Sequence, residues 1–328
     1  MADRIRKVNV DTGTVHLVIS GDKFPAASNI NGIEVSNNGT LYAADIVENV
    51  VYKIFEDGQI HGVLVGKIGV AGDVEQSGVQ SVQAYAAGTA GPARLDAPSN
   101  IAIDASDNIY ITDLSNYKVK RISSSGRCKV LAGSTVGDTC SENGTAAKFT
   151  AIRGIAVDKS GNLYVCDFIR NKIKKVLQNG AVRALAGSAS GTAGLANGQG
   201  MVARFSTPRD ICADASGNLY VADSGNNCIR RITQSGDVTI LAGSATGAQG
   251  YVNSDNGLSA RFDNPCRISM DPSGQFLYVL DYGNMVIRKV WTSGKTTTVM
   301  ALVNNDLNYA GDIAVDKSGV LYVLEKIA

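Results

Sequence analysis

The chain repeats one unit of about forty residues, and the last copy of this unit is divided between the two ends of the sequence. Two of the five complete copies run from Ala151 to Ser188 and from Thr207 to Ser244. The sixth copy begins at Gly311 and stops with the sequence, while residues 1–21 resemble its missing second half. Because each repeat buries its faces on its neighbours, a unit completed by both ends predicts a closed ring.

Each unit contains four short apolar runs with turn residues between them. Pairs such as Ser216-Gly217 and Ser235-Gly236 follow the first and third runs, where tight hairpin turns require a positive φ. One tyrosine of the second run marks six units: Tyr42, Tyr110, Tyr164, Tyr220, Tyr278 and Tyr322. The pattern predicts an all-β fold, a six-bladed β-propeller with four antiparallel strands in each blade. The N-terminal and C-terminal segments each supply two strands of the sixth blade, which is split between residues 1–21 and 308–328.

The closed ring also decides the domain organisation. A chain of 328 residues is ordinarily expected to form two domains, but a ring of repeats is one cooperative body, so we predict a single domain over residues 1–328. No apolar run approaches the length of about 18 residues that a membrane span needs, and the N-terminus lacks the apolar core of a signal peptide. We therefore expect a soluble protein, and the sequence assigns no compartment.

The charge balance excludes one class of partner. The net charge is +1, from 31 basic and 30 acidic residues, so no overall field attracts a polyanion and no nucleic-acid partner is predicted. Eleven basic side chains recur at one place, the third run of each unit: Arg6, Lys7, Lys53, Lys120, Arg121, Lys174, Lys175, Arg230, Arg231, Arg288 and Lys289. We expect them to pair with neighbouring acids or to lie over the blade surfaces.

Several motifs resemble the NHL-repeat family of six-bladed propellers. They are the opening at Pro98–Asp104 and Pro208–Asp214, the second run that ends in an aspartate, and the Ala-Arg-Phe triplets at 203–205 and 260–262. The resemblance covers essentially the whole chain and implies the propeller fold. It implies little about function, because members of this family carry protein, RNA or small-ligand sites on the same platform.

Cysteine and histidine spacing indicates no metal centre and no cofactor. No Cys-x-x-Cys pair occurs, and the two histidines, His16 and His61, lie in fourth runs of different units. Cys166 stands where other units have small residues, as does Cys212, so we expect both to be buried. Cys128 and Cys140 bracket a fourth run and its loop, and a disulfide between them is left open, since it depends on an oxidising compartment.

Candidate binding residues cluster where the innermost strands begin, at the predicted mouth of the central channel. The expected ligand-binding set is Arg153, Arg209, Asp210, Arg267, Asp312 and Asn100. The connections between second and third strands add a rim: Glu48, Asn116, Tyr117, Arg170, Asn227 and Tyr282. Three arginines from consecutive blades can hold a carboxylate or phosphate by bidentate hydrogen bonds. The alternative is that arginines and aspartates pair with one another and plug the channel.

Two functions remain open at this stage. The first is a non-catalytic binding or scaffold module for a protein or a small anionic ligand, possibly a component of a larger assembly. The second is a metal-dependent hydrolase similar to the lactonases of related propellers, with Glu34, Asn100, Asp210 and Asp312 as loose counterparts of the calcium ligands. Neighbouring arginines disfavour a divalent cation there. The sequence shows no nucleophile with a histidine base, so no catalytic residues are predicted.

Overall fold

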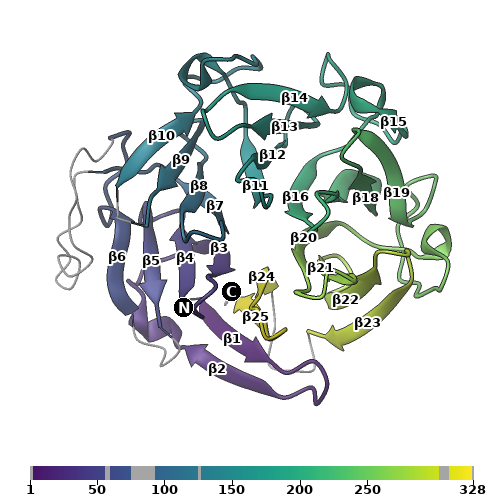
Figure 1. Cartoon of the computed structure of the whole chain (residues 1–328). Helices are drawn as coiled ribbons and strands as arrows, with labels where there is room; N and C mark the ends of the chain where they lie inside the picture. The colour runs from purple at the N-terminus through teal and green to yellow at the C-terminus, as the bar shows by residue number, and fades with distance from the viewer. Residues whose placement is uncertain (1–2, 56–59, 75–92, 125–126, 303–309, 327–328) are drawn as a thin grey trace.

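The computed structural model describes residues 3–55, 60–74, 93–124, 127–302 and 310–326. Their strands form six antiparallel sheets around a central channel, with one sheet per blade (Figure 1). Blade 1 consists of β3 (Ile30–Val35), β4 (Leu41–Asp45), β5 (Val50–Ile54) and β6 (Ile60–Gly66). Blade 2 consists of β7 (Pro98–Ile103), β8 (Ile109–Asp113), β9 (Lys118–Ile122) and β10 (Cys128–Ala132). Blade 3 consists of β11 (Ile152–Val157), β12 (Leu163–Asp167), β13 (Lys172–Val176) and β14 (Val182–Ala186). The all-β, six-bladed prediction is confirmed.

Blades 4 and 5 follow the same plan, with one addition at the outer edge of blade 4. They consist of β16 (Pro208–Ala213), β17 (Leu219–Asp223), β18 (Cys228–Ile232) and β19 (Asp237–Gly243), and of β20 (Pro265–Met270), β21 (Phe276–Asp281), β22 (Val286–Trp291) and β23 (Thr296–Ala301). A two-residue strand, β15 (Gly198–Gln199), pairs with β19 and protects the edge that would otherwise be open.

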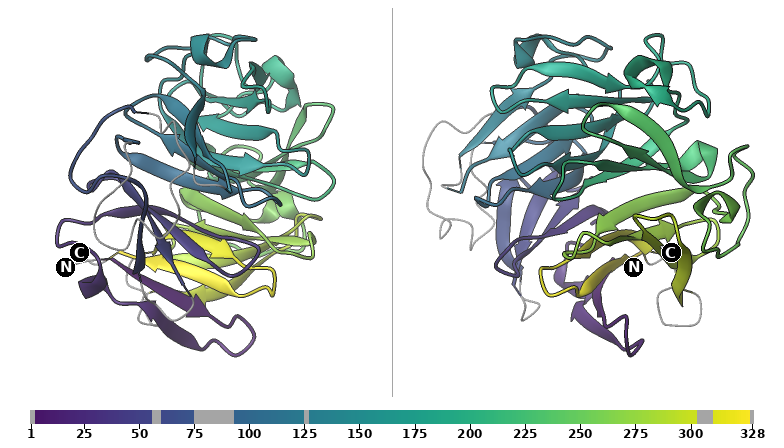
Figure 2. Two further views of the ribbon diagram at one scale, coloured as in Figure 1. Left: turned by 60° about the vertical axis from the view of Figure 1, so that its left-hand side comes forward. Right: turned by 45° about the vertical axis from the view of Figure 1, so that its right-hand side comes forward.

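The sixth blade joins the two ends of the chain. It contains β1 (Arg4–Val8), β2 (Val15–Ile19), β24 (Ala310–Val315) and β25 (Leu321–Glu325), in the order β2-β1-β25-β24. β1 pairs with β25 along its whole length, from Arg4 opposite Glu325 to Val8 opposite Leu321. The N- and C-terminal ends therefore lie together in both sets of views (Figures 1 and 2). The predicted closure, with two strands from each end, is confirmed.

The apolar core is divided among the interfaces between neighbouring blades. The described residues form six buried clusters, and each contains side chains from two adjacent blades. The repeated tyrosine links the two sides: Tyr220 of blade 4 packs with Phe262 and Ile268 of blade 5. Its hydroxyl donates to Asp214 at 3.0 Å, so the polar end of the buried ring is satisfied. Each blade thus depends on its neighbours for its core.

Short 3-10 turns lie in the loops. Four of them connect successive blades: η1 (Gly21–Lys23), η3 (Gly144–Ala146), η4 (Gly200–Val202) and η6 (Gly257–Ser259). The fifth, η5 (Ser224–Asn226), lies between β17 and β18 of blade 4. Gly144 shows how tightly these connections pack, because a Cβ there would lie 2.2 Å from the carbonyl oxygen of Gly180. Within the described residues, no helix has the length and apolar character needed to cross a bilayer.

All six cysteines are free thiols. Cys128 is buried in β10 whereas Cys140 is exposed, and no disulfide joins them. Cys166 is fully buried, and burial raises the pKa of its thiol well above the ordinary value. Cys212 is only partly buried. The sequence also predicts hairpin turns at Asp57-Gly58 and Ser125-Gly126. Both turns lie outside the described residues, as do residues 75–92 of the long insert between β6 and β7.

Candidate functional site at the channel mouth

The six innermost strands are β3, β7, β11, β16, β20 and β24, and they contact one another in this order around the channel. Each contains a register shift near its start, as between Pro208 and Asp210. Such a bulge re-aims the side chains beside it. The strands approach so closely here that a Cβ on Gly154 would lie 2.5 Å from the Cα of Asp210. Sequence and backbone together therefore concentrate polar side chains at one level of the channel.

A cavity of about 190 Å³ occupies the channel. Its polar lining comes from Glu34, Asn100, Asp210 and Asp312, and the rest is largely apolar. Burial raises the pKa of Glu34 to about 8, against the hydrogen bond from Val35, and the negative charges of Asp312 and Asp210 add to the rise. The glutamate therefore keeps its proton at neutral pH, and the cavity is less negative than its composition indicates.

Arg267 locks one side of the channel. Its Nε lies 3.1 Å from Asp312 Oδ1, and its guanidinium also donates to the carbonyl oxygens of Asn31 and Gly311. Asp312 in turn accepts hydrogen bonds from the backbone N–H groups of Ile33 and Ile313 at 2.8 and 2.9 Å. Burial alone would lower the pKa of Arg267, but the charges of Asp312 and Asp210 raise it. The ion pair of Arg267 with Asp312 is the kind of contact expected if arginines and aspartates pair with one another and plug the channel.

Asp210 is held by neutral donors. Its Oδ2 accepts from the backbone N–H of Ile268 at 3.0 Å, and its Oδ1 accepts from the side-chain amide of Asn100 at 3.2 Å. Burial raises the pKa of Asp210 to about 7, although the charge of Arg267 opposes the rise. Asn100 and Asp210 are thus brought together across the channel.

Arg153 and Arg209 are placed differently. Both guanidinium groups lie over the ring of Phe168, at 4.7 and 5.9 Å from its centroid, in the geometry of a cation–π contact. Neither forms an ion pair with a described residue, and the Nε of each is buried without a hydrogen-bond partner there. Burial, followed by the positive charges of Arg209 and Arg267, lowers the pKa of Arg153. We call Arg153 and Arg209, which lie over the ring of Phe168, the arginine pair.

Several predicted rim residues have structural contacts. The side-chain amide of Asn116 donates to Asp113 at 2.7 Å and to the carbonyl of Gly72 at 2.6 Å. Asn227 adopts a left-handed φ of 52°, donates to the carbonyl of Gly247, and accepts from the N–H of Asn264. Tyr117 has the same left-handed conformation, with φ of 57°. The side chains of Asn116 and Asn227 therefore hold turns of the connecting loops, and the backbone of Tyr117 forms part of such a turn.

The other rim residues divide between burial and exposure. Glu48 is only 7% exposed, so it points into the protein rather than out from the rim. Arg170 is partly buried, and its Nε has no hydrogen-bond partner among the described residues. Tyr282 is 41% exposed. Arg170 and Tyr282 remain available on the mouth face.

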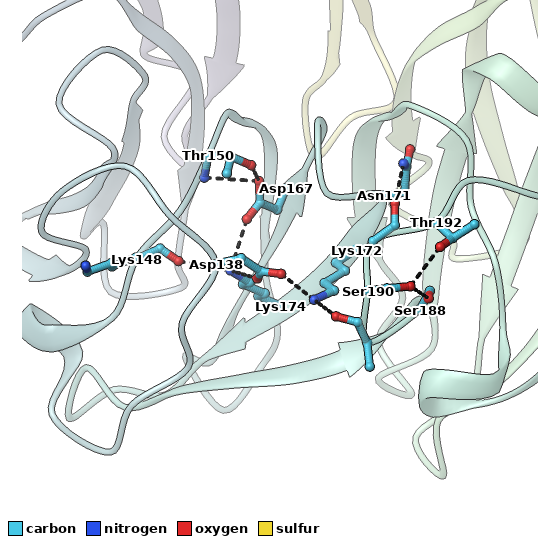
Figure 3. Close-up of polar contacts among 12 residues, drawn as sticks. Asp138, Lys148, Thr150, Asp167, Asn171, Lys172, Lys174, Ser188, Ser190 and Thr192 are labelled. Carbon is cyan, nitrogen blue, oxygen red and sulfur yellow. Dashed lines mark hydrogen bonds and ion pairs between the residues drawn. The ribbon is translucent and has the colours of Figure 1, made fainter.

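Five of the recurring basic residues of the third strands form ion pairs with acids of their own blade: Arg6, Lys120, Lys174, Arg230 and Arg288. Others lie over aromatic rings, as Lys175 does over Tyr164 and Lys289 over Phe276. Lys174 lies 3.0 Å from Asp167 and 2.8 Å from Asp138, and it also donates to the carbonyl of Lys148 (Figure 3). Lys172 pairs with the same Asp138. The predicted pairing with neighbouring acids is therefore present in blade 3. Arg153 and Arg209 stand outside this network.

Two family models match parts of the sequence. The model of the NHL repeat matches residues 205–232, and the model of the teneurin NHL domain matches residues 4–123. The chain carries NHL repeats. Human NHL repeat-containing protein 2 is 26% identical over 322 residues, covering 90% of this chain and 44% of the relative. The chain spans less than half the length of the curated relatives reported for it.

Solved structures with the same fold include both binding proteins and enzymes. A chain of a nidogen/laminin complex superposes with a TM-score of 0.59 and 17% identity, over 90% of this NHL propeller and 92% of that chain. A gluconolactonase from Xanthomonas campestris gives a TM-score of 0.60 and 13% identity, over 98% and 95%. These identities establish the fold alone, so the chemistry of the site has to decide between the two classes.

The channel of this NHL propeller does not fit the calcium centre of a lactonase. Glu34, Asn100, Asp210 and Asp312 line one cavity, as the alternative requires. However, the three acids of this cavity are not grouped so that they could hold a metal ion together. Arg267 already supplies the positive charge beside Asp312, and Asn100 bonds to Asp210. A divalent cation would be repelled by this guanidinium.

Proposed function

We propose that this NHL propeller is a binding module whose mouth face takes up an acidic side chain of a protein partner. The observation that carries the proposal is the arginine pair. Two guanidinium groups share one ring and have no acidic partner among the described residues. Like charges held together cost free energy in the unbound protein, and a carboxylate placed between them removes that cost.

The surroundings favour a protein over a small molecule. Neither Arg153 nor Arg209 lines the channel cavity, so the pair is not at the bottom of an enclosed pocket. Exposed apolar side chains occupy connections between second and third strands, like the one that contains Phe168: Val47 is 45% exposed, Ile169 is 61% exposed and Tyr282 is 41% exposed. Arginine and aromatic residues amid apolar surface are typical of the centres of protein interfaces.

Binding of an acidic peptide to the full chain tests this proposal. We expect a Glu-rich peptide to bind and its Gln-substituted counterpart not to bind. Arg209→Ala should weaken binding of the acidic peptide by about 1.5–3 kcal/mol, roughly 10- to 150-fold, the range for a hydrogen bond to a charged group. Arg183→Ala is the matched control, because Arg183 is an exposed arginine of the outer strand β14 that pairs with Glu142.

The same titration separates the alternatives. Equal binding of both peptides, or equal losses in the two arginine variants, would show that the arginine pair is not the site. Saturation by inorganic phosphate or citrate with no response to peptide would assign a small anion instead.

A further inference from the structure

A buried acid ends the second strand of every blade, and in five blades a basic residue of the third strand neutralises it. The distances between the acidic oxygen and the basic nitrogen are 2.9 Å for Asp113 with Lys120, 3.0 Å for Asp167 with Lys174, 3.0 Å for Asp223 with Arg230, 2.8 Å for Asp281 with Arg288 and 2.8 Å for Glu325 with Arg6. Blade 1 is different. Its acid is Asp45, and the equivalent position of β5 is Tyr52, opposite Ala43 as Lys120 is opposite Ile111.

Asp45 is fully buried and only half satisfied. Its Oδ1 accepts hydrogen bonds from the backbone N–H groups of Asn29, Val47 and Glu48, at 3.2, 3.0 and 2.9 Å. Its Oδ2 has no hydrogen-bond partner among the described residues. The hydroxyls of Tyr52, which is 2% exposed, and Ser28 are likewise buried without such a partner.

A second exchange adds to the deficit of positive charge. In three other blades, the residue three positions after the acid is an asparagine that donates to the acid: Asn116 at 2.7 Å, and Asn226 and Asn284 at 2.8 Å. In blade 1 this residue is Glu48, only 7% exposed, whose carboxylate forms no ion pair with a described residue. The formal charge of the equivalent group changes from zero for Asp113, Asn116 and Lys120 to minus two for Asp45, Glu48 and Tyr52.

Tyr52 supplies no counter-charge, because a phenol is neutral and its ionisation would add a further negative charge. It places a neutral hydroxyl group at the strand position where Lys120 has its ammonium group in blade 2. Two buried carboxylates without a counter-charge are strongly unfavourable, and proteins meet this need with a paired base or a bound cation.

We propose that Ser28, Asp45, Glu48 and Tyr52 bind a calcium ion, which takes the role that lysine or arginine has in the other blades. The cluster offers two carboxylates and two hydroxyls, all oxygen ligands of the kind that Ca²⁺ prefers, and a divalent ion matches the charge of minus two. The site lies within blade 1, away from the channel cavity, and it is independent of the arginine pair. Ser28 lies in the segment that precedes β3, whereas Asp45 and Tyr52 belong to β4 and β5. The ion would therefore link this segment to the second and third strands of blade 1.

The first test measures calcium directly on the full chain. Equilibrium dialysis after removal of metal with a chelator is expected to give one Ca²⁺ per chain. The melting temperature should rise with Ca²⁺ and gain a constant increment per tenfold increase once the concentration exceeds the dissociation constant. Mg²⁺ should give a smaller rise, because it demands a stricter octahedral geometry. Absence of bound Ca²⁺ together with an unchanged melting temperature would overturn the proposal.

The second test returns an internal cation to blade 1. Tyr52→Lys copies blade 2, so this variant should bind no Ca²⁺ and should melt at the same temperature with calcium or chelator. Glu48→Asn removes one carboxylate while copying Asn116, and it should weaken Ca²⁺ binding at least tenfold. This variant provides the test if Tyr52→Lys fails to fold. Glu142→Gln is the control, because Glu142 is an exposed acid paired with Arg183. Calcium binding that survives in both blade 1 variants, or is lost in the control, would place the ion elsewhere.

Discussion

Arg6 and Glu325 are separated by 319 positions in the sequence, yet Arg6 Nε lies 2.8 Å from Glu325 Oε2. The pair joins β1 to β25 across the point where the ring closes, and the glutamate side chain is only 3% exposed. The same pairing of acid and base stabilises the interior of blades 2 to 5. The two ends of the chain therefore form an ordinary blade interior.

Closure makes the whole ring depend on the first strand. A chain that starts at Val15 lacks β1, so β25 loses one of its two ladder partners and Glu325 loses its counter-charge. We expect a lower melting temperature for the entire protein in one transition, because each blade buries its faces on the next. Differential scanning calorimetry measures this directly. A melt as cooperative and as high as that of the full chain would refute the structural role of β1.

A point substitution isolates the ion pair from the strand. Arg6→Met leaves Glu325 buried without a partner and should cost about 3–5 kcal/mol of unfolding free energy, the usual result of breaking a buried pair. Adding Glu325→Gln should recover part of this loss in a double-mutant cycle. Equal losses in the single and double variants would show that Glu325 does not need Arg6.

The fold was predictable because its signals recur. Six tyrosines at one position of the repeat mark six blades, and the structure buries each of them between neighbouring blades. The pairing of third-strand bases was predictable for the same reason. A basic residue that recurs once per blade, such as Lys174 or Arg230, indicates a structural role in the repeat. Here that role is to neutralise the buried aspartate beside it.

The candidate site was predictable only in outline, because its residues do not recur. The sequence places Arg209 and Arg267 in the same group, although Arg267 aligns with Asp210 and Asp312 and Arg209 stands one position earlier. One residue along a strand changes the direction of a side chain, so Arg267 reaches Asp312 while Arg209 lies over Phe168. Phe168 was not predicted, although blade 5 has the predicted rim residue Tyr282 at the same position, because blades 1, 2 and 4 have Ile46, Leu114 and Ser224 there and show no recurring aromatic residue.

Protonation in the channel predicts a pH dependence of stability. The pKa of Glu34 is raised from 4.5 to about 8 by burial, so between these values the folded state holds a proton that the unfolded state releases. The stabilising contribution is complete below about pH 4.5 and is lost as the pH rises toward 8. Asp210, with its pKa raised to about 7, changes stability in the same direction.

Replacement of Glu34 by an uncharged isostere tests this. Glu34→Gln should melt at the wild-type temperature at pH 5 and at least roughly 2–4 °C above it at pH 8, the shift that about 1 kcal/mol gives in a large domain. The exposed Glu142 provides the control, since Glu142→Gln should bring no gain at pH 8. A constant difference between wild type and Glu34→Gln across this range would mean that Glu34 titrates normally.

Two arginines of the channel mouth should respond in opposite ways to removal. Arg267→Met strips a buried partner from Asp312 and two donors from the carbonyls of Asn31 and Gly311, and should cost about 3–5 kcal/mol. Arg209→Ala removes a charge that repels Arg153 and has no acidic partner among the described residues, so unfolding free energy should stay within about 0.5 kcal/mol or rise. Urea titration of both variants without ligand measures the contrast. If Arg209→Ala lowers the unfolding free energy as much as Arg267→Met, both arginines have structural partners in the channel. The channel mouth would then have no unpaired arginine to bind an acidic partner.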